Sequence, residues 1–298
     1  MRPIEGIFLL LLIVVVYQFI FQEKNLKNNS LLKILFSIFV LHFFLEHTRW
    51  QMIPAYTTAL IVILFGYKKF HLLIKGALIL LLIVSLLIPI AVPVIKLPKL
   101  NGPYEIGSLT HHWIDHDREE WFTHENPDDN RQLMVQFWYP GIKNKKGDRS
   151  PYLDKLDLRA KTLGDAGNFP SFLAKHVNLT KTNSFLGLKP DKKNAPFPVI
   201  IISHGITGMR QIHTALAEKL ANNGYAVAAL NHSYDANLTI FTDGSLADYR
   251  SEITGHPDSI NIRSKQIETR SKDISFIIDQ LEKIQSGKIK HPLNGYLD

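Results

Sequence analysis

The chain has 298 residues, a formal net charge of +7 and no cysteine, so disulfide bonds and thiolate metal sites are excluded. Basic and aromatic residues form no stripe of the kind that binds nucleic acid, and we expect no nucleic-acid partner. Apolar residues are unevenly distributed. The first hundred residues are mostly Leu, Ile, Val and Phe, whereas the remainder has the mixed composition of a soluble domain.

Four apolar stretches precede residue 100, at Ile4–Phe21, Leu31–Leu45, Met52–Tyr67 and Leu72–Ile95. A membrane-spanning helix needs about 20 mainly apolar residues, which the first and last stretches supply. The second and third reach that length only with their flanks, so a re-entrant or interfacial hairpin is the alternative for this pair. No small-residue cleavage pattern follows the first stretch, which argues against a signal peptide. We expect a transmembrane bundle of about four helices over residues 1–98.

The lysines of the short loops predict the orientation of this bundle. The first and third loops are the most basic, whereas the second carries only Arg49; the lysines are Lys24, Lys27, Lys33, Lys68, Lys69 and Lys75. The positive-inside rule places these two loops in the cytoplasm and both termini outside. We therefore expect a multi-pass protein of the plasma membrane, in contact with the lipid bilayer, whose second domain lies outside the cytoplasm.

Polar residues interrupt the end of the second apolar stretch. His42, Glu46 and His47 would line a polar site within the bundle on one interpretation. The other interpretation makes them interfacial. It is favoured because Arg49 and Trp50 follow at once, as in the aromatic and basic belt at a membrane surface.

A second domain is predicted over residues 101–298, because Asn101–Pro103 is a turn-forming boundary. Leu133–Tyr139 has the β-branched and aromatic composition of a strand and is followed by Pro-Gly. The long polar stretch Lys143–Asn194 should contain short helices, for example at Ser171–Asn178, that would cover an active site. Its basic run Lys143–Lys146 is predicted to be a loop.

The last hundred residues alternate strand and helix patterns. Phe197–Ser203 is an apolar run typical of a parallel strand buried on both faces, and Ala226–Leu230 is a second buried strand. Between them, Gln211–Asn222 has a helical pattern that places Ile212, Leu216 and Leu220 on one face. A long helix is expected at Ile262–Gln285. Its apolar stripe is Ile267, Ile274, Ile277, Ile278, Leu281 and Ile284. This order predicts a parallel α/β sheet, whose next element would be a strand at the end of the sequence.

One segment is rich in histidine and is a candidate metal site. It comprises His111, His112, His116 and His124 near Asp115 and Asp117. A zinc site needs defined geometry and supporting hydrogen bonds, and a polar hairpin is the favoured interpretation. We expect neither a metal nor a cofactor.

The sequence FPVIIISHGITGMR, residues 197–210, is a buried strand that runs into a His-Gly loop. Such a loop supplies the oxyanion hole of an α/β-hydrolase, yet no G-x-S-x-G nucleophile elbow occurs in the sequence.

An ordered series of segments resembles one family, the plasma-type platelet-activating-factor acetylhydrolases and their bacterial relatives. The segments are Gly102–Gly107, Arg118–Glu120, Arg131–Pro140, Phe197–Gly208, Gly224–His232, Phe241–Gly244 and Arg270–Asp273. The N-terminal helices, including Arg49–Pro54, resemble the membrane anchor of some bacterial members. The resemblance implies an incomplete α/β-hydrolase domain, with a doubly wound and mostly parallel sheet, in a bacterial plasma membrane.

The family cleaves short or oxidised acyl chains from phospholipids through a serine nucleophile, so the resemblance implies a lipid or small ester as substrate. It maps one oxyanion-hole backbone N–H to Ile206, directly after Gly205. His204, His232 and Asp235 are candidates for substrate contact. The nucleophile, acid and base have no counterpart in the sequence. A replacement triad of Ser203, His232 and Asp235 is disfavoured, since Ser203 lies at a strand end without an elbow.

The absence of a nucleophile leads to several expectations. The strand at Val199–Ser203 would be an unpaired, apolar sheet edge. The chain alone would be inactive. We expect the sequence to be a fragment or a prematurely terminated product of a longer ester-hydrolase gene; the alternative is a genuine short protein whose partner supplies the missing strands. The alternative function is a degenerate, non-catalytic membrane protein that serves as an anchor or interaction module.

Overall fold

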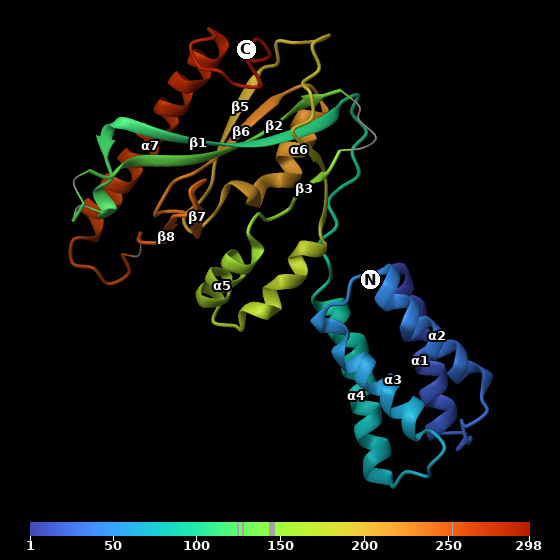
Figure 1. The fold of residues 1–298 in the computed structure, drawn as a ribbon. Coiled ribbons are helices and arrows are strands. Elements are labelled where there is room, and N and C mark those ends of the chain that lie inside the picture. The colour runs from blue at the N-terminus through green and yellow to red at the C-terminus, as the bar shows by residue number, and fades with distance from the viewer. Residues whose placement is uncertain (124, 127, 143–146, 252) are drawn as a thin grey trace. The chain divides into compact units, whose positions relative to one another are not determined.

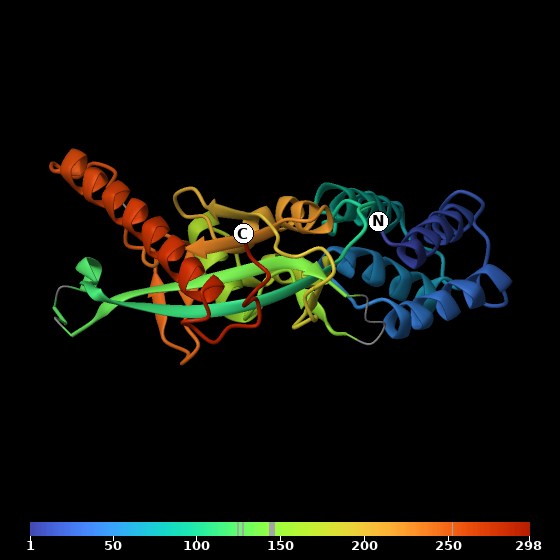
Figure 2. The same cartoon turned by 90° about the horizontal axis from the view of Figure 1, so that it is seen from above.

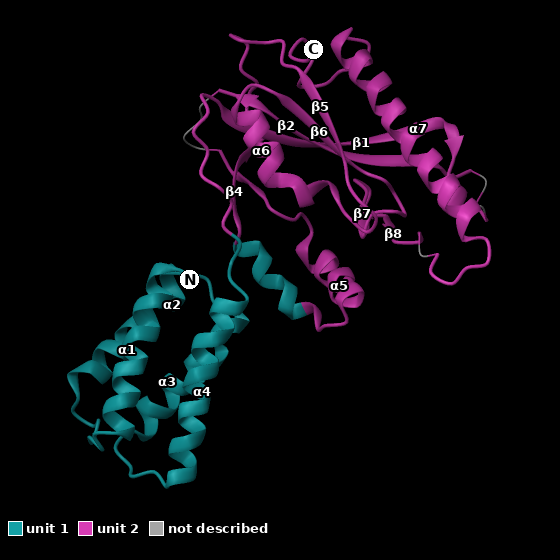
Figure 3. Cartoon of the chain, turned by 180° about the vertical axis from the view of Figure 1, so that it is seen from behind, with its two compact units in different colours: residues 1–95, 172–179 teal, residues 96–171, 180–298 magenta. Residues whose placement is uncertain are grey.

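The computed structural model describes residues 1–298 except 124, 127, 143–146 and 252. His124 and the predicted loop Lys143–Lys146 therefore lie outside the described residues. The chain divides into two compact units (Figure 3). Unit 1 comprises residues 1–95 and 172–179, and unit 2 comprises residues 96–171 and 180–298.

Unit 1 contains four α-helices: α1 (Pro3–Ile20), α2 (Ser30–Leu45), α3 (Ile53–Phe65) and α4 (Leu72–Ala91). Proline in the first turn suits the start of α1 and of α3, because its missing N–H would have no partner there. The side chain of Asn29 caps α2 by accepting a hydrogen bond from the Leu31 N–H. The prediction of about four helices is confirmed.

Apolar side chains fill the interior of unit 1 and also cover much of its exterior. Phe8, Leu12, Leu35 and Val62 are fully buried between the helices. By length and composition, α1 and α4 could cross a membrane, whereas α2 and α3 are shorter. Only 17% of the apolar stretch that forms α4 is buried inside the structure. Most of its leucines and isoleucines therefore face outward.

A buried polar cluster joins the ends of α1 and α2. The Arg49 side chain has no exposed surface and donates two hydrogen bonds to Glu5, at 2.8 and 3.0 Å. Glu46 accepts from the backbone N–H groups at the start of α1, and its carboxylate lies 3.3 Å from Nδ1 of His42. His42 and Glu46 therefore take part in a polar cluster within the unit, where His42 Nε2 also lies 2.6 Å from the Tyr56 hydroxyl. His47 remains exposed.

Unit 2 is built on a six-stranded sheet with the order β3-β4-β1-β2-β6-β5 (Figure 1). The strands are β1 (Glu105–Glu119), β2 (Asn130–Gly141), β3 (Arg149–Pro151), β4 (Lys181–Leu186), β5 (Val199–Ser203) and β6 (Ala226–Asn231). β1 and β2 form a long antiparallel hairpin that extends beyond the other strands (Figure 2). The sheet is mixed, which corrects the prediction of a mostly parallel sheet. Only β1–β4 and β5–β6 pair in parallel, whereas β1–β2, β2–β6 and β3–β4 pair antiparallel.

Helices pack on both faces of this sheet. Successive residues of β2 alternate, so that Phe137 packs with the face covered by α7 (Ser259–Gln285) and Trp138 with the face covered by α6 (Thr214–Asn222). The helix α6 buries Ala217 and Ala221 against Trp138. The helix begins at Thr214, later than predicted, so Ile212 lies in the 3₁₀ turn η4 (Arg210–His213) before it. Ile212 and Leu216 are both more than half exposed, because small side chains of α6 pack beside the indole instead.

The helix α7 follows its predicted range closely but buries a narrower stripe. Ile277, Leu281 and Ile284 enter the core, whereas Ile267 is 60% exposed. Gln266 and Asp273 also lie on the buried side of this helix. The prediction from apolar residues alone missed these two polar positions, because buried hydrogen bonds rather than apolar area hold them there.

The polar stretch after β2 contains more regular structure than predicted. It forms β3, α5 (Leu156–Gly167), the 3₁₀ segment η3 (Ser171–Leu179) and β4. The predicted helix at Ser171–Asn178 is thus confirmed as a helical turn. It packs in unit 1, where Trp50 Nε1 donates to the Leu173 carbonyl. The loop after β6 also folds into a small hairpin, β7 (Leu238–Ile240) and β8 (Leu246–Asp248).

β5 is the last strand of the sheet, and its residues are only half-buried rather than covered on both faces. The open edge is partly occupied by Tyr296–Asp298. These residues run parallel to the start of β5 and make three backbone hydrogen bonds of 2.8–3.2 Å with Phe197 and Val199. Within the described residues, no strand pairs with the outer edge from Ile200 to Ser203. The predicted open edge is thus confirmed for Ile200–Ser203, whereas Val199, predicted to be unpaired, donates to the Asp298 carbonyl.

We predict that residues 101–298 expressed alone are insoluble or molten, because β5 offers an apolar edge for intermolecular pairing. Size-exclusion chromatography and thermal melting would test this expectation. A monomer with a sharp, cooperative transition would contradict it.

Candidate active site

The candidate site lies where two neighbouring parallel strands end. Ser203 ends β5 directly beside Leu230 of β6, so the loops that begin at His204 and at His232 leave the same edge of the sheet. Ligands of open α/β sheets bind outside the carboxyl ends of the strands, where loops diverge. This edge is therefore the place to look for chemistry.

Hydrogen bonds fix the loop from His204 to Gly208. The buried His204 ring accepts from the His232 backbone N–H at 3.0 Å, and its Nδ1 lies 2.6 Å from the Gly205 carbonyl. The Gly208 N–H donates back to Gly205, and the Thr207 N–H donates to the Asp235 carbonyl. A side chain at Gly208 would place its Cβ only 2.9 Å from the Cβ of His204, so glycine is the residue that fits here.

Two backbone donors of this loop stay available. Among the described residues, no hydrogen bond is made by the N–H of Gly205 or Ile206. Ile206 is 47% exposed, and a Cβ built on Gly205 would meet nothing within 4 Å. An oxyanion hole requires free N–H groups that a substrate oxygen can reach, and this loop meets that requirement.

A serine, a histidine and a carboxylate are linked beside the loop. Ser203 Oγ lies 2.8 Å from His232 Nε2, and His232 Nδ1 lies 2.8 Å from Asp273 Oδ2. Ser203 is exposed, whereas the other two side chains have no exposed surface. This arrangement has the connectivity of a serine–histidine–aspartate triad.

The charges around Asp273 limit what this triad can do. Arg131 donates to both carboxylate oxygens, at 3.0 and 2.6 Å, and Arg118 lies 3.0 Å away. Burial favours a protonated Asp273, but the Arg131 charge outweighs it and holds the Asp273 pKa well below its usual range. Burial lowers the His232 pKa, and the contact with Asp273 restores only part of it. The imidazole is therefore neutral, and the carboxylate is already neutralised by guanidinium groups.

Arg270 connects α7 to both loops. Its guanidinium donates to Asp235 at 2.6 Å, to the His204 carbonyl, and to Ser203 Oγ at 3.3 Å. A cation beside Ser203 and His232 disfavours a protonated imidazole, which a general base must become. Arg270 also holds the His204 carbonyl, whereas the N–H groups of Gly205 and Ile206 make no hydrogen bond to a described residue.

The structure brings the residues predicted from the sequence into one cluster. Gly205 and Ile206 lie on its open side, whereas His204, His232 and Asp235 are buried beneath it. Sequence reasoning did not find Asp273 as the partner of His232, and Asp235, which it weighed and disfavoured for that role, pairs with Arg270 instead. The signal was present in the Arg270–Asp273 segment, since a charged pair on the apolar side of a long helix demands a buried partner.

The side chains of the histidine-rich segment make separate contacts with different parts of the structure. His111 packs against Trp113 and His291, and His112 lies within hydrogen-bond distance of Gln132 and Thr242. The metal-like group found among the described residues is Glu5, His42 and Glu46 in unit 1. There, Arg2 and Arg49 already occupy the Glu5 carboxylate, so a metal cation would have to displace two guanidinium groups.

Residues 90–296 match the family model described as platelet-activating factor acetylhydrolase, isoform II. This range covers more than half of the chain. The chain belongs to this family. The match includes the whole sheet, the His204–Gly208 loop and α7, whereas α1–α3 precede it.

Curated relatives are platelet-activating factor acetylhydrolases from Canis lupus familiaris (26% identity over 217 residues) and Cavia porcellus (28% over 213). Each alignment covers 68% of this chain and 44% of the relative, so the chain spans less than half the length of the relatives it matches. Among solved structures, a ferulic acid esterase from Streptomyces cinnamoneus is similar. Its TM-score is 0.48 at 28% identity, covering 62% of this chain and 48% of that one.

We predict that acidification destabilises unit 2 through His204. Burial lowers the pKa of His204 to about 4, whereas an unfolded histidine titrates near ~6.5. Between these two pKa values the unfolded chain binds more protons than the folded chain. The free energy of unfolding therefore decreases as the pH is lowered through this range. His232, also lowered, acts in the same direction.

Melting temperatures of the full chain across this pH window would test the prediction. The His204→Asn variant should show a flatter dependence, and a matched His213→Asn change at an exposed position should not. An unchanged slope in His204→Asn would refute the assignment.

Proposed function

We propose that the chain is part of a carboxylic-ester hydrolase that acts on short-chain acyl phospholipid-like esters. The observation that carries the proposal is the His204–Gly208 loop, whose free Gly205 and Ile206 N–H groups lie at the carboxyl end of β5 in a member of this family. In this role the Ile206 N–H stabilises the negative charge that develops on the ester carbonyl oxygen. One such donor contributes about 10²–10³ in kcat.

We further propose that the nucleophile lies outside residues 1–298. No G-x-S-x-G elbow occurs in the sequence, and the chain spans less than half of its relatives. The Ser203–His232–Asp273 array is the competing candidate, because its two 2.8 Å contacts have triad connectivity. Its charges argue instead for a structural role: with Arg131, Arg118 and Arg270 close by, His232 is a poor proton acceptor.

The helical unit is proposed to anchor the enzyme in a bilayer. Outward-facing apolar side chains of α4 support this, since leucines such as Leu80 are 63% exposed in the isolated chain. An anchor would hold the catalytic unit beside a phospholipid substrate. We retain the orientation with both termini outside the cytoplasm, based on the basic loops.

Activity of the chain alone is tested with membranes that contain it, a short-chain nitrophenyl ester and a fluorophosphonate probe. We expect no turnover and no labelling. Labelling that disappears in Ser203→Ala would make Ser203 the nucleophile and contradict the proposal.

The enzyme lineage is tested by reading the coding DNA beyond codon 298. A frame that encodes a G-x-S-x-G elbow supports the proposal. In the product of that frame, Ile206→Pro should lower kcat about 10²–10³-fold, because it removes the N–H, while Ile206→Val should not. A gene with no such remnant would favour the alternative, a non-catalytic anchor or interaction module.

A further inference from the structure

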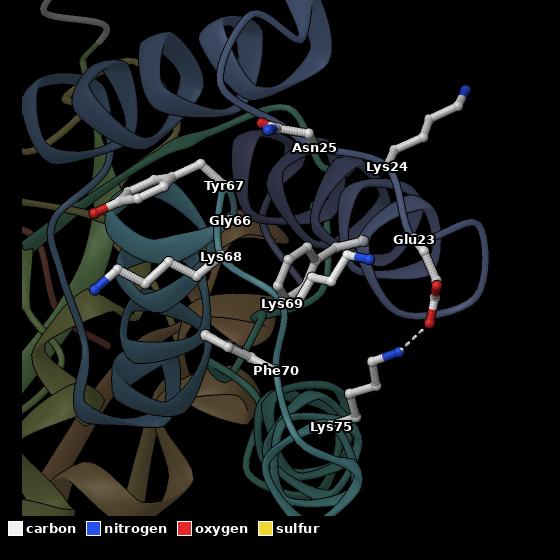
Figure 4. Close-up of a pocket in the computed structure, with 10 residues that line it drawn as sticks. Glu23, Lys24, Asn25, Gly66, Tyr67, Lys68, Lys69, Phe70 and Lys75 are labelled. Atoms are coloured by element: carbon white, nitrogen blue, oxygen red, sulfur yellow. Dashed lines mark hydrogen bonds and ion pairs between the residues drawn. The ribbon is translucent and has the colours of Figure 1, made fainter.

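A second candidate site lies at one end of the helices of unit 1. The segment that follows α1 and the segment that precedes α4 enclose a pocket of about 180 Å³ (Figure 4). The Leu26 N–H donates to the Gly66 carbonyl at 3.0 Å, and the Phe19 ring meets Phe70 edge to face with ring centroids 5.1 Å apart. These contacts hold together two loops that are distant in the sequence.

The lining of this pocket is basic. Its charged residues are four lysines and one glutamate, namely Lys24, Lys68, Lys69, Lys75 and Glu23. Lys75 donates to Glu23 at 2.7 Å. The hydrogen bond and charge of Lys75, and to a smaller extent the charge of Lys69, hold the pKa of Glu23 below its ordinary value. Two ammonium groups thus share one carboxylate, which leaves an excess of one positive charge at this point of the lining.

The directions of the lysine side chains decide which of them can act together. In Figure 4, Lys69 and Lys75 extend toward Glu23, whereas Lys24 and Lys68 point outward on different sides. Lys68 packs over neighbouring aromatic rings of its own loop. Lys69, with Lys75 beside it, is therefore the group that an anion in the pocket would meet.

The position of the pocket along the helices points to a lipid. By length and composition α1 and α4 could cross a membrane, and the pocket residues come just after Ile20 at the end of α1 and just before Leu72 at the start of α4. Lipid head groups lie at this level, beyond the apolar part of a spanning helix. Leu72 and Leu73 are 78% and 79% exposed, and Phe21 is also exposed, so apolar surface adjoins the lysines. An amphiphile with an anionic head group matches both features.

The size of the pocket favours a head group over a whole soluble ligand. Pockets that enclose a drug-sized molecule measure about 300–1,000 Å³, and this one is smaller. A phosphate group fits inside, while the remainder of its molecule stays outside the pocket. In the orientation proposed above, the two loops face the cytoplasmic leaflet, whose anionic lipids attract basic segments.

We propose that this pocket binds the phosphate of an anionic phospholipid, with Lys69 and Lys75 on the phosphate and Phe21, Leu72 and Leu73 against the acyl chains. The inference rests on the proposed bilayer anchor and is independent of ester hydrolysis by unit 2. It gives unit 1 a specific lipid contact in addition to its general apolar surface.

The experiment is native mass spectrometry of the full chain in an uncharged detergent. The ligands are dioleoyl phosphatidylglycerol, dioleoyl phosphatidylcholine, dioleoylglycerol and inorganic phosphate. We expect phosphatidylglycerol to bind best, and dioleoylglycerol, which lacks the phosphate, to bind at least about tenfold more weakly. Equal binding of phosphatidylglycerol and either of the other two lipids would overturn the proposal. Inorganic phosphate that binds as tightly as phosphatidylglycerol would assign the pocket to the free anion and also overturn it.

Association of the chain with liposomes, resistant to alkaline carbonate, is measured in parallel because it tests the anchor itself. A chain that is extracted by carbonate would contradict the anchor and this site together. A chain that resists extraction but does not prefer phosphatidylglycerol would contradict the site alone.

Variants locate the binding. Lys69→Gln changes an exposed side chain and should weaken phosphatidylglycerol binding about tenfold, whereas Lys69→Arg should retain it. Glu23→Gln removes the offsetting carboxylate and should strengthen binding. Lys27→Gln removes the same charge from an exposed lysine that is not among the lining residues, and should have no effect. Equal losses in Lys69→Gln and Lys27→Gln would mean attraction to a generally basic chain, and would refute the site.

Discussion

The carboxylate of Asp273 is the point at which the long helix α7 is bound to the sheet. Arg131 of β2 donates to both of its oxygens, and His232 beyond β6 contacts one of them. Arg131 also reaches Glu120, so one buried guanidinium serves two carboxylates. Breaking a buried pair of this kind leaves an uncompensated charge and costs about 3–5 kcal/mol. The cluster therefore fixes one relative position of hairpin, helix and strand ends more strictly than apolar packing alone.

The geometry of the loop from His204 to Gly208 follows from this cluster. With His232 held by Asp273, the His232 backbone N–H is in place to bond the His204 ring, and Ser203 is tied to the same imidazole. Arg270, one turn before Asp273 on α7, binds the His204 carbonyl and Asp235. The loop is thus held through its carbonyl and side-chain groups, and the Gly205 and Ile206 N–H groups are left for a ligand. A triad-like array can in this way serve as a support for the site rather than as its nucleophile.

Apolar patterning located most of the fold in advance. The strands at Leu133, Val199 and Ala226 and the helix at Ile277 fall where the sequence places them, because each is marked by an apolar pattern, although β5 at Val199 is only half-buried. Apolar patterning did not predict the packing of small residues. In α6, Ala217 faces the core and Leu216 is exposed, because Trp138 fills the space beside the helix. Apolar patterning did not predict the buried polar networks either. A single sequence shows that Asp273 and Arg49 are charged but not which distant residue pairs with them, so both the Asp273–His232 contact and the Glu5–Arg49 cluster required the structure.

Hydrogen exchange of the full chain, read by mass spectrometry, tests the central role of Asp273 most directly. Asp273→Asn keeps the side-chain shape but removes the charge, and Asp279→Asn makes the same change at an exposed position of α7. We predict that Asp273→Asn speeds exchange in the peptides that cover residues 200–210 and 228–236. Asp279→Asn should leave the exchange of these peptides unchanged. Unchanged protection of both segments in Asp273→Asn would contradict the view that this carboxylate holds the His204–Gly208 loop in place.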